Sequence, residues 1–372
     1  MPCERQRASI RAAETESTEI AMEFYGFSFG RMSRVHSKVY YARTSNNLQM
    51  VKGLRLGIKF SGDTNALRMA RVASLAERLG FHSLWATESR FTRDAVSRAA
   101  MLAVLTKRVI VGTAVVNAFT RSLAVLASTA ATIDEASRGR FILGLGAGGE
   151  RFISSQGIGF ERPLKRLEEF TVLLRQIWEG RSVSFVGQTI EVSGITLGFR
   201  PVRPRIPVYY GVTGNKAIDL ASRLSDGIIL NAYTSLSYNR NANRRIRGSP
   251  DGARLPVLGN VAVSMDPDTD AAILAAKPMV FTYVTSFPAL AKANGVPESH
   301  VKELIELERK DGLKMALQSL DDKWVLELAA VGGPEECRKR VRQYAGVGLD
   351  EVLLTAISGN EAEVTREMSQ LL

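Results

Sequence analysis

The sequence predicts a (β/α)8 TIM barrel with insertions, and three observations lead to this fold class. From Leu54 onwards, short β-branched runs alternate with amphipathic stretches, which is typical of repeated βα units around a parallel sheet. Eight such strands can be counted. The segment that contains them spans roughly 320 residues, which suits a barrel of the usual size with added insertions. A doubly wound open sheet is the alternative fold.

The expected strands are short, and most of them are rich in Val, Ile and Leu. They cover Leu54–Phe60, Ser83–Thr87, Val109–Val116, Phe141–Gly146, Pro207–Gly211, Gly227–Asn231, Val257–Ser264 and Glu351–Thr355. The helical stretches repeat apolar residues at three- and four-residue spacing. They cover Asn65–Leu79, Asp94–Thr106, Leu123–Ala136, Pro163–Glu179 and Asn215–Leu224. Two insertions are expected, a hairpin that turns at Gly187 within Val183–Val192 and a long helical region over Asp268–Ala330.

The chain has 372 residues, and its first 50 show no sustained periodicity. We therefore expect a flexible N-terminal extension over residues 1–50 and one barrel domain over residues 51–372. Met50 stands just before the first strand, so a misassigned translation start is a further hypothesis, which N-terminal sequencing of the native protein would test. The sequence contains no run of about 18 apolar residues, and its first residues lack the apolar stretch typical of a signal peptide, so neither a membrane span nor a signal peptide is expected. A soluble, cytoplasmic protein that does not enter a membrane is expected.

Lysine and arginine outnumber the acidic residues by 49 to 38, which gives a formal net charge of +11. A basic excess can indicate nucleic-acid binding, but here it is spread along the chain. Its densest cluster lies in a polar stretch that we expect to form a loop, and comprises Arg240, Arg244, Arg245, Arg247 and Arg254. Aromatic residues for base stacking are sparse there. No nucleic-acid partner is expected; a solvated basic loop is the first interpretation, and attraction of a small polyanion is the second.

Residue types that bind metals or attack substrates are sparse. The cysteines, Cys3 and Cys337, and the histidines, His36, His82 and His300, lie far apart in the sequence. No disulfide framework and no metal site is therefore expected. A nucleophile motif such as G-x-S-x-G is also missing. This profile suits an enzyme whose cofactor carries the chemistry.

Two glycine-containing loops follow expected strands. Gly144–Gly149 matches G-x-G-x-x-G, but three βα units precede it, and the next helix is expected only near Pro163, so a dinucleotide fingerprint is disfavoured. A glycine-rich loop that lines the mouth of a barrel is preferred. The second loop leads from Gly211 into a helix, whose first N–H groups could hold a phosphate beside Thr213 and Lys216. Thr213 or Asn215 as a plain N-cap is the alternative.

Eight segments carry a resemblance to a known family. They are Gly112–Arg121, Ala131–Arg140, Leu143–Gly148, Phe199–Arg203, Pro207–Gly214, Ser225–Asn231, Val331–Cys337 and Gly348–Leu354. In this order they resemble the bacterial-luciferase-like superfamily, and within it most closely the coenzyme F420-dependent methylenetetrahydromethanopterin reductases. The resemblance covers about residues 54–357. It implies a TIM barrel without metal, with F420 or a flavin at the C-terminal face of the strands, and a homo-oligomer.

The resemblance also implies roles for individual residues. A bulge with a non-prolyl cis peptide, here between Ala114 and Val115, would back the cofactor ring; an ordinary strand is the alternative. Asn117 matches the asparagine that follows this bulge, although Ala118 stands where the family has proline. The resemblance implies two further groups of residues. The group that would cover the cofactor is Gly146, Ala147, Gly148 and Gly149. The group that would bind its phosphate is Val212, Thr213, Gly214, Asn215 and Lys216.

This chain departs from the family pattern at two places. After the second strand the family often has Asp-His, whereas this chain has Glu88-Ser89, which keeps the carboxylate and loses the imidazole. Glu88 is the candidate catalytic residue, as a hydrogen-bond partner of the reduced ring or a proton relay; a capping or structural role is the alternative. The reductase has an acidic residue on its first strand where this chain has Lys59, a charge reversal that argues against a pterin substrate.

The function that follows from the resemblance is hydride transfer between reduced F420 and a small-molecule acceptor, by an oxidoreductase that acts on CH–NH or CH–OH groups. Such a reaction depends largely on how donor and acceptor are oriented. The net positive charge is compatible with the phosphate and polyglutamate tail of F420. An FMN-dependent luciferase-like monooxygenase is the alternative enzyme, and a catalytically silent flavin- or F420-binding protein is the alternative outside catalysis.

Overall fold

The computed structural model describes residues 54–89, 91–357 and 360–372. The expectations for residues 1–50, a flexible extension and a later translation start, lie outside these residues. Within the described part of the chain, no helix combines the length and the apolar character that crossing a membrane requires.

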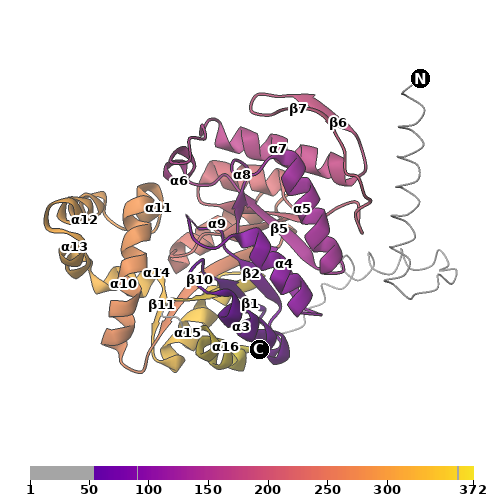
Figure 1. Cartoon of the computed structure of the whole chain (residues 1–372). Coiled ribbons are helices and arrows are strands. Elements are labelled where there is room, and N and C mark those ends of the chain that lie inside the picture. Colours follow the sequence, from indigo (N-terminus) through magenta and orange to yellow (C-terminus); the bar gives the residue numbers. More distant parts are fainter. Residues whose placement is uncertain (1–53, 90, 358–359) are drawn as a thin grey trace, which may run out of the picture. The chain divides into compact units, whose positions relative to one another are not determined.

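The described strands form one large parallel sheet and one separate hairpin (Figure 1). Their bounds are β1 Leu56–Phe60, β2 Ser83–Ala86, β3 Ile110–Thr113, β4 Val116–Asn117, β5 Phe141–Gly146, β6 Val183–Val186, β7 Glu191–Ile195, β8 Val208–Val212, β9 Gly227–Leu230, β10 Val257–Met265, β11 Ala330–Gly332 and β12 Glu351–Ala356. The large sheet closes because β12 pairs with both β10 and β1. The order around the barrel is β1-β2-β3-β5-β8-β9-β10-β12, which confirms the predicted fold class.

Helices follow most of the barrel strands and cover the sheet from outside (Figure 1). They are α3 Ala66–Leu79, α4 Ala95–Leu105, α5 Leu123–Ala136, α6 Glu150–Ser154, α7 Pro163–Trp178, α8 Asn215–Leu224, α9 Leu236–Arg247, α10 Thr269–Ser286, α11 Pro288–Ala293, α12 Glu298–Asp311, α13 Leu313–Ser319, α14 Asp322–Leu328, α15 Pro334–Ala345, α16 Glu361–Met368 and the 3-10 turn Ser369–Leu371. All five helices predicted by periodicity are confirmed, as are the hairpin β6–β7 and the helical insertion α10–α14.

Helix α3 shows why the periodic segments fold as predicted. The side chain of Asn65 caps its first turn by accepting a hydrogen bond from the backbone N–H of Arg68, at 2.9 Å. Met69, Val72 and Ala76 lie three and four residues apart and are fully buried against the sheet. Gly80 ends the helix with φ of 90°, a left-handed conformation that favours glycine.

The arginines Arg240 to Arg247 lie on a helix, α9, so the expected loop is wrong for them, whereas Arg254 lies in the turn that follows. The buried face of α9 includes Asn239 and Asn243, so the three- and four-residue spacing of apolar residues that predicts a helix is interrupted in the sequence. The amide nitrogens of both side chains donate to backbone carbonyl oxygens: Asn239 to that of Ser235 at 2.9 Å, and Asn243 to that of Gly348 at 3.0 Å. Asparagines can thus lie on the inner face of this helix because the N–H groups of each amide find backbone acceptors there.

Two smaller expectations also need correction, and one strand was not expected. A short helix, α6, begins directly after the glycine-rich loop, with Gly149 as its N-cap, so the delay of the next helix to Pro163 is wrong. The third barrel strand is not continuous, because it breaks into β3 and β4 at Ala114–Val115. Finally, β11 extends the sheet beside β10 without being part of the barrel, and the sequence pattern did not indicate it.

Two of the resembling segments contribute arginines that hold the barrel together. Arg203 donates two hydrogen bonds to the buried carboxylate of Asp134, at 2.8 and 2.6 Å. Arg140 donates to the backbone oxygens of Ala103, Thr106 and Val109 at 2.6–2.8 Å. Arg203 also donates to the backbone oxygen of Phe141, so it joins α5 to β5, and Arg140 holds the segment between α4 and β3; these segments therefore have a structural role of their own.

Candidate functional site

The break in the third barrel strand is a bulge. From Gly112 to Val116 the strand advances four residues, while its partner β5 advances three, from Ile142 to Leu145. The peptide between Ala114 and Val115 is cis, so this prediction is confirmed. A bulge of this kind re-aims a side chain beside a site.

The Val115 side chain is held among glycines of the two following barrel strands. A Cβ atom added at Gly146 would lie 2.7 Å from one methyl group of Val115, and one added at Gly211 would lie 2.9 Å from the other. Real Cβ atoms do not approach other atoms this closely, so these positions must lack a side chain for Val115 to fit. Val115 and the backbone of β5 and β8 thus form one wall of the barrel mouth.

The predicted cofactor residues converge at one end of adjacent strands. Asn117 pairs in register with Gly146, and Gly146 pairs with Gly211. Because all these strands are parallel, the loops that follow them open on the same face of the barrel. This end contains the loop of residues 146–149 and the loop of residues 212–216, with Ala147 partly buried and Gly148 and Gly149 exposed. Gly148 has φ of 80°, which favours glycine.

The second loop ends in an open helix N-terminus. Gly214 is the N-cap of α8, and no side chain caps the helix, so the alternative of Thr213 or Asn215 as N-cap is wrong. Thr213, Asn215 and Lys216 are all exposed. The strand before them is anchored, because the Tyr238 hydroxyl donates to the backbone oxygen of Thr213 at 2.5 Å. An uncapped first turn beside a lysine fits an anionic group such as a phosphate.

Glu88 lies at the same rim, after β2, and both of its carboxylate oxygens are engaged. It accepts a hydrogen bond from the amide of Asn117 at 3.0 Å and forms an ion pair with Arg121 at 2.6 Å. Asn117 in turn accepts hydrogen bonds from the backbone N–H groups of Phe119 and Thr120, both at 2.9 Å. Burial raises the pKa of Glu88 above its ordinary value, although Arg121 opposes this shift. Glu88 therefore ties the β2 loop to the loop after β4.

A second buried carboxylate, which the sequence pattern did not single out, lies inside the barrel at the start of β12. Glu351 accepts a hydrogen bond from the hydroxyl of Ser83, and this hydroxyl accepts one from the indole N–H of Trp85 at 2.5 Å. The Nε2 atom of His82 lies 3.9 Å from the Oε2 atom of Glu351. Burial and the charge of Arg55 lower the pKa of His82, so its imidazole is neutral near pH 7. Burial raises the pKa of Glu351 to about 7. The chain Glu351–Ser83–Trp85 fixes the large ring that fills the barrel interior.

The raised pKa of Glu351 predicts a dependence of stability on pH. The folded state binds this proton up to about pH 7 and the unfolded state only up to 4.5, so wild-type stability falls as pH rises between these values. The variant Glu351→Gln is expected to lose this fall, which amounts to about 3 kcal/mol. Urea unfolding of both proteins across this range checks it, with Glu363→Gln, an exposed site on α16, as control. Parallel pH profiles for wild type and Glu351→Gln would contradict the assignment.

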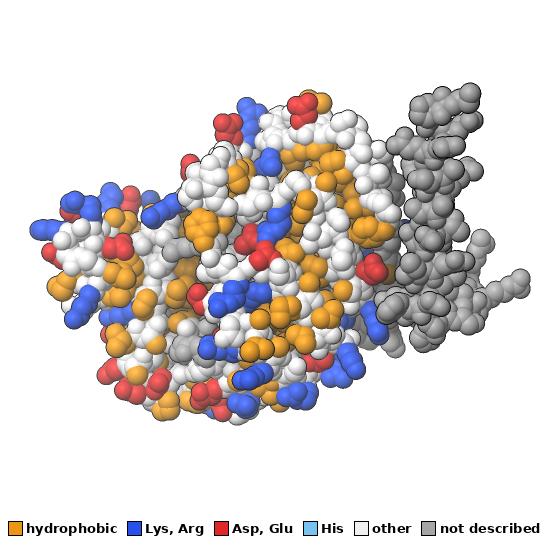
Figure 2. Space-filling model, viewed as in Figure 1, with side chains coloured by type: hydrophobic (Ala, Val, Ile, Leu, Met, Phe, Trp, Pro, Cys, Tyr) orange, Lys and Arg blue, Asp and Glu red, His pale blue; other side chains and the backbone are white. Residues whose placement is uncertain are grey.

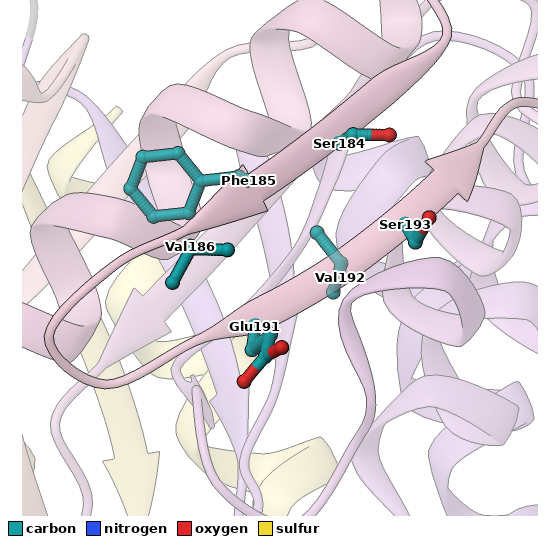
Figure 3. Close-up of a pocket in the computed structure, with 6 residues that line it drawn as sticks. All are labelled: Ser184, Phe185, Val186, Glu191, Val192 and Ser193. Carbon is teal, nitrogen blue, oxygen red and sulfur yellow. The ribbon is translucent and has the colours of Figure 1, made fainter.

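An open depression of about 720 Å³ lies elsewhere, on the hairpin β6–β7. All six lining residues belong to the two hairpin strands, and none is a predicted site residue (Figure 3). Figure 2 shows that basic and acidic side chains are interspersed on the face in view. Two arginines of α9 also form ion pairs, Arg245 with Asp219 at 2.6 Å and Arg247 with Asp350 at 2.5 Å. We therefore place the candidate site at the barrel mouth, where the predicted residues meet.

Comparisons with known proteins agree with this architecture. The family model for luciferase-like monooxygenases matches residues 54–351. The 5,10-methylenetetrahydromethanopterin reductase of Archaeoglobus fulgidus is 30% identical over 310 residues, which cover 81% of this chain and 92% of that protein. The F420-dependent glucose-6-phosphate dehydrogenase of Nakamurella multipartita is 25% identical over 324 residues, which cover 82% and 91%.

A solved structure shows the same fold. The coenzyme F420-dependent tetrahydromethanopterin reductase from Methanopyrus kandleri superposes with a TM-score of 0.74 at 21% identity, over 85% of this chain and 98% of that one. Together with the match of the family model to most of the barrel, this establishes the family. The chain belongs to the luciferase-like monooxygenase family, as its sequence motifs predicted.

Proposed function

We propose that this chain is an oxidoreductase that uses coenzyme F420 to transfer a hydride to or from a small-molecule substrate. Two relatives named for F420-dependent or methanopterin-reducing activity, each aligned over more than four fifths of the chain, support this class. The observation that carries the proposal is the arrangement at the barrel mouth. There the Val115 wall, the open glycine loop and the uncapped start of α8 lie on adjacent strands.

The residues present fit such a cofactor. Val115, which packs against Gly146 and Gly211, offers an apolar side chain against which a ring could lie. Gly149 and Gly214 face open space, because a Cβ atom added at either meets nothing within 4 Å. The first N–H groups of α8, with Thr213 and Lys216, would take the phosphate. When bound, F420 supplies the carbon that gives or accepts the hydride.

For Glu88 we propose a positioning role in this reaction. Its bonds to Asn117 and Arg121 hold the two loops that would flank the cofactor ring. Substrate and cofactor would then meet in a fixed geometry, which is the main requirement for hydride transfer. A Glu88→Gln variant whose kcat loses a pH dependence that wild type shows, at unchanged F420 affinity and unchanged stability, would instead identify Glu88 as the proton donor.

The finer assignment concerns the substrate. An activity like that of the methylenetetrahydromethanopterin reductases is supported by the 30% identity to the A. fulgidus protein. Another relative, at 25% identity, is named for a different substrate, glucose 6-phosphate, so the comparisons support the reaction class more strongly than one substrate. The FMN-dependent monooxygenase is the alternative, and the cofactor titration below separates it from the F420 enzyme.

The cofactor assignment predicts the outcome of a fluorescence titration. Wild-type protein is expected to bind F420 clearly more tightly than FMN, with an affinity that falls as salt is added. Lys216→Met is expected to weaken F420 binding about tenfold, because one charge-assisted contact to the phosphate is lost. Lys339→Met, which removes the same charge from an exposed position on α15, serves as control. Tight FMN binding without F420 binding would overturn the cofactor, and equal F420 affinity in both variants would overturn the phosphate site.

A further inference from the structure

A lysine is buried inside the barrel close to the candidate site. Lys59 is the second to last residue of β1 and is only 7% exposed. The side chains of its neighbours Ile58 and Phe60 belong to the core between the sheet and the surrounding helices. Because successive side chains of a strand point to opposite faces of the sheet, the side chain of Lys59 points towards the barrel interior. In register it lies beside Trp85 of β2, which belongs to the interior cluster.

The amine of Lys59 lacks a counter-charge within the protein. Among residues 54–89, 91–357 and 360–372, no hydrogen bond or ion pair involves this amine. Burial alone lowers its pKa from 10.5 to about 8. Two largely buried carboxylates lie on or after the strands that pair with β1, and both have other partners. Glu88, which follows β2, pairs with Arg121, and Glu351, which begins β12, accepts a hydrogen bond from Ser83. A buried cation without a partner is costly, and proteins retain one mainly where a ligand completes it.

The surroundings of Lys59 form a polar arc inside the barrel. Its strand β1 follows β12 and β10, which contribute the buried side chains Thr355 and Asn260. The Thr355 hydroxyl donates to the Asn260 side-chain oxygen at 3.4 Å. The cofactor residues lie on other strands of the ring, β4, β5 and β8, with β2 and β3 between β1 and that group. Lys59 thus occupies the part of the interior that the cofactor residues leave for a substrate.

We propose that Lys59 binds an anionic oxygen group of the substrate, a phosphate or a carboxylate, and so selects negatively charged substrates for the reaction. This inference rests on the proposed function for the reaction itself, but the anion site can be measured independently of turnover. A bound anion supplies the missing counter-charge and accepts hydrogen bonds from the amine. Thr355 and Asn260 lie on the strands that would flank such a group.

Calorimetric titration of the full-length protein loaded with F420 tests the site, because the cofactor then occupies the uncapped start of α8. Inorganic phosphate and acetate are the two probes, and they distinguish phosphate from carboxylate recognition. Wild type is expected to bind at least one of them, and Lys59→Met to bind that probe at least about tenfold more weakly. Lys339→Met, on the exposed face of α15, is expected to bind like wild type.

Two further readouts keep the outcome decisive. The same anion is expected to raise the unfolding temperature of wild type but not of Lys59→Met, since only the folded wild type binds it. F420 affinity, measured in the same samples, is expected to be equal in both proteins. Loss of F420 binding in every sample would refute the proposed function and leave the anion site to be judged on unloaded protein. Equal anion affinity in wild type and Lys59→Met, or no binding of either probe to wild type, would overturn the inference.

Discussion

Replacing Gly144 with alanine is expected to destabilise the protein by more than about 3 kcal/mol, or to prevent folding at 37 °C. Gly144 lies in the middle of β5, where a Cβ atom would stand 1.7 Å from the backbone oxygen of Thr113. A carbonyl oxygen cannot rotate away as the end of a flexible side chain can. The Thr113 hydroxyl also donates to the Gly144 oxygen at 2.8 Å, so any shift of the strand breaks this contact.

The expected result can be checked by urea unfolding, with Gly159→Ala as the matched control. Gly159 is exposed, and a Cβ atom added there meets nothing within 4 Å, so the same substitution is expected to change stability by less than about 1 kcal/mol. Surviving Gly144→Ala protein is also expected to bind F420 poorly, because Val115 packs against the same stretch of β5. A Gly144→Ala variant as stable as wild type would show that the bulge can move without cost.

Replacing Lys59 with methionine is expected to raise the free energy of unfolding by about 3 kcal/mol at pH 7, which is the free energy equivalent of lowering its pKa from 10.5 to about 8. Methionine has a similar length and volume and carries no charge, so the core is filled while the desolvation of an ammonium group is avoided. A gain in stability on loss of a residue marks a group retained for function.

The sign of the pH dependence gives this prediction a second test. The folded protein releases the Lys59 proton near pH 8 and the unfolded chain near 10.5, so between these values the unfolded state binds more protons and wild-type stability rises with pH. The advantage of Lys59→Met is therefore greatest below about pH 8 and disappears above about 10.5. Urea unfolding at several pH values measures both. A less stable Lys59→Met variant would mean that the amine has a partner in the folded protein.

Local sequence patterns predicted most of the secondary structure. The apolar spacing in α3 and α8 reflects which residues face the sheet, and this spacing depends only on near neighbours in the chain. The same logic failed for α9, because Asn239 and Asn243 fill positions that usually hold apolar residues. The partner of Asn243, Gly348, lies 105 residues away in sequence, so no local pattern could have indicated this contact.

The candidate site was predicted in outline from loops and a resemblance. The sequence placed Gly146–Gly149 and Val212–Lys216 after strands, and the parallel barrel brings those loops to one face. It also singled out Glu88 and Asn117, but it did not indicate that they bond to each other. Glu351 escaped notice, because a carboxylate that follows Asp350 in a polar turn looks solvent-exposed until β12 closes the barrel.

The sequence by itself determined the fold class, the order of its units and the segments that carry the family resemblance. These follow from local periodicity, turn residues and motif order, which are properties of short stretches of chain. Only the tertiary structure decided which polar groups are paired inside the barrel. It joins Ser83 to Glu351 across 268 residues and leaves Lys59 without a counter-charge among the described residues. The physical reason is that burial and pairing depend on strands distant in sequence, and these meet only when the barrel closes.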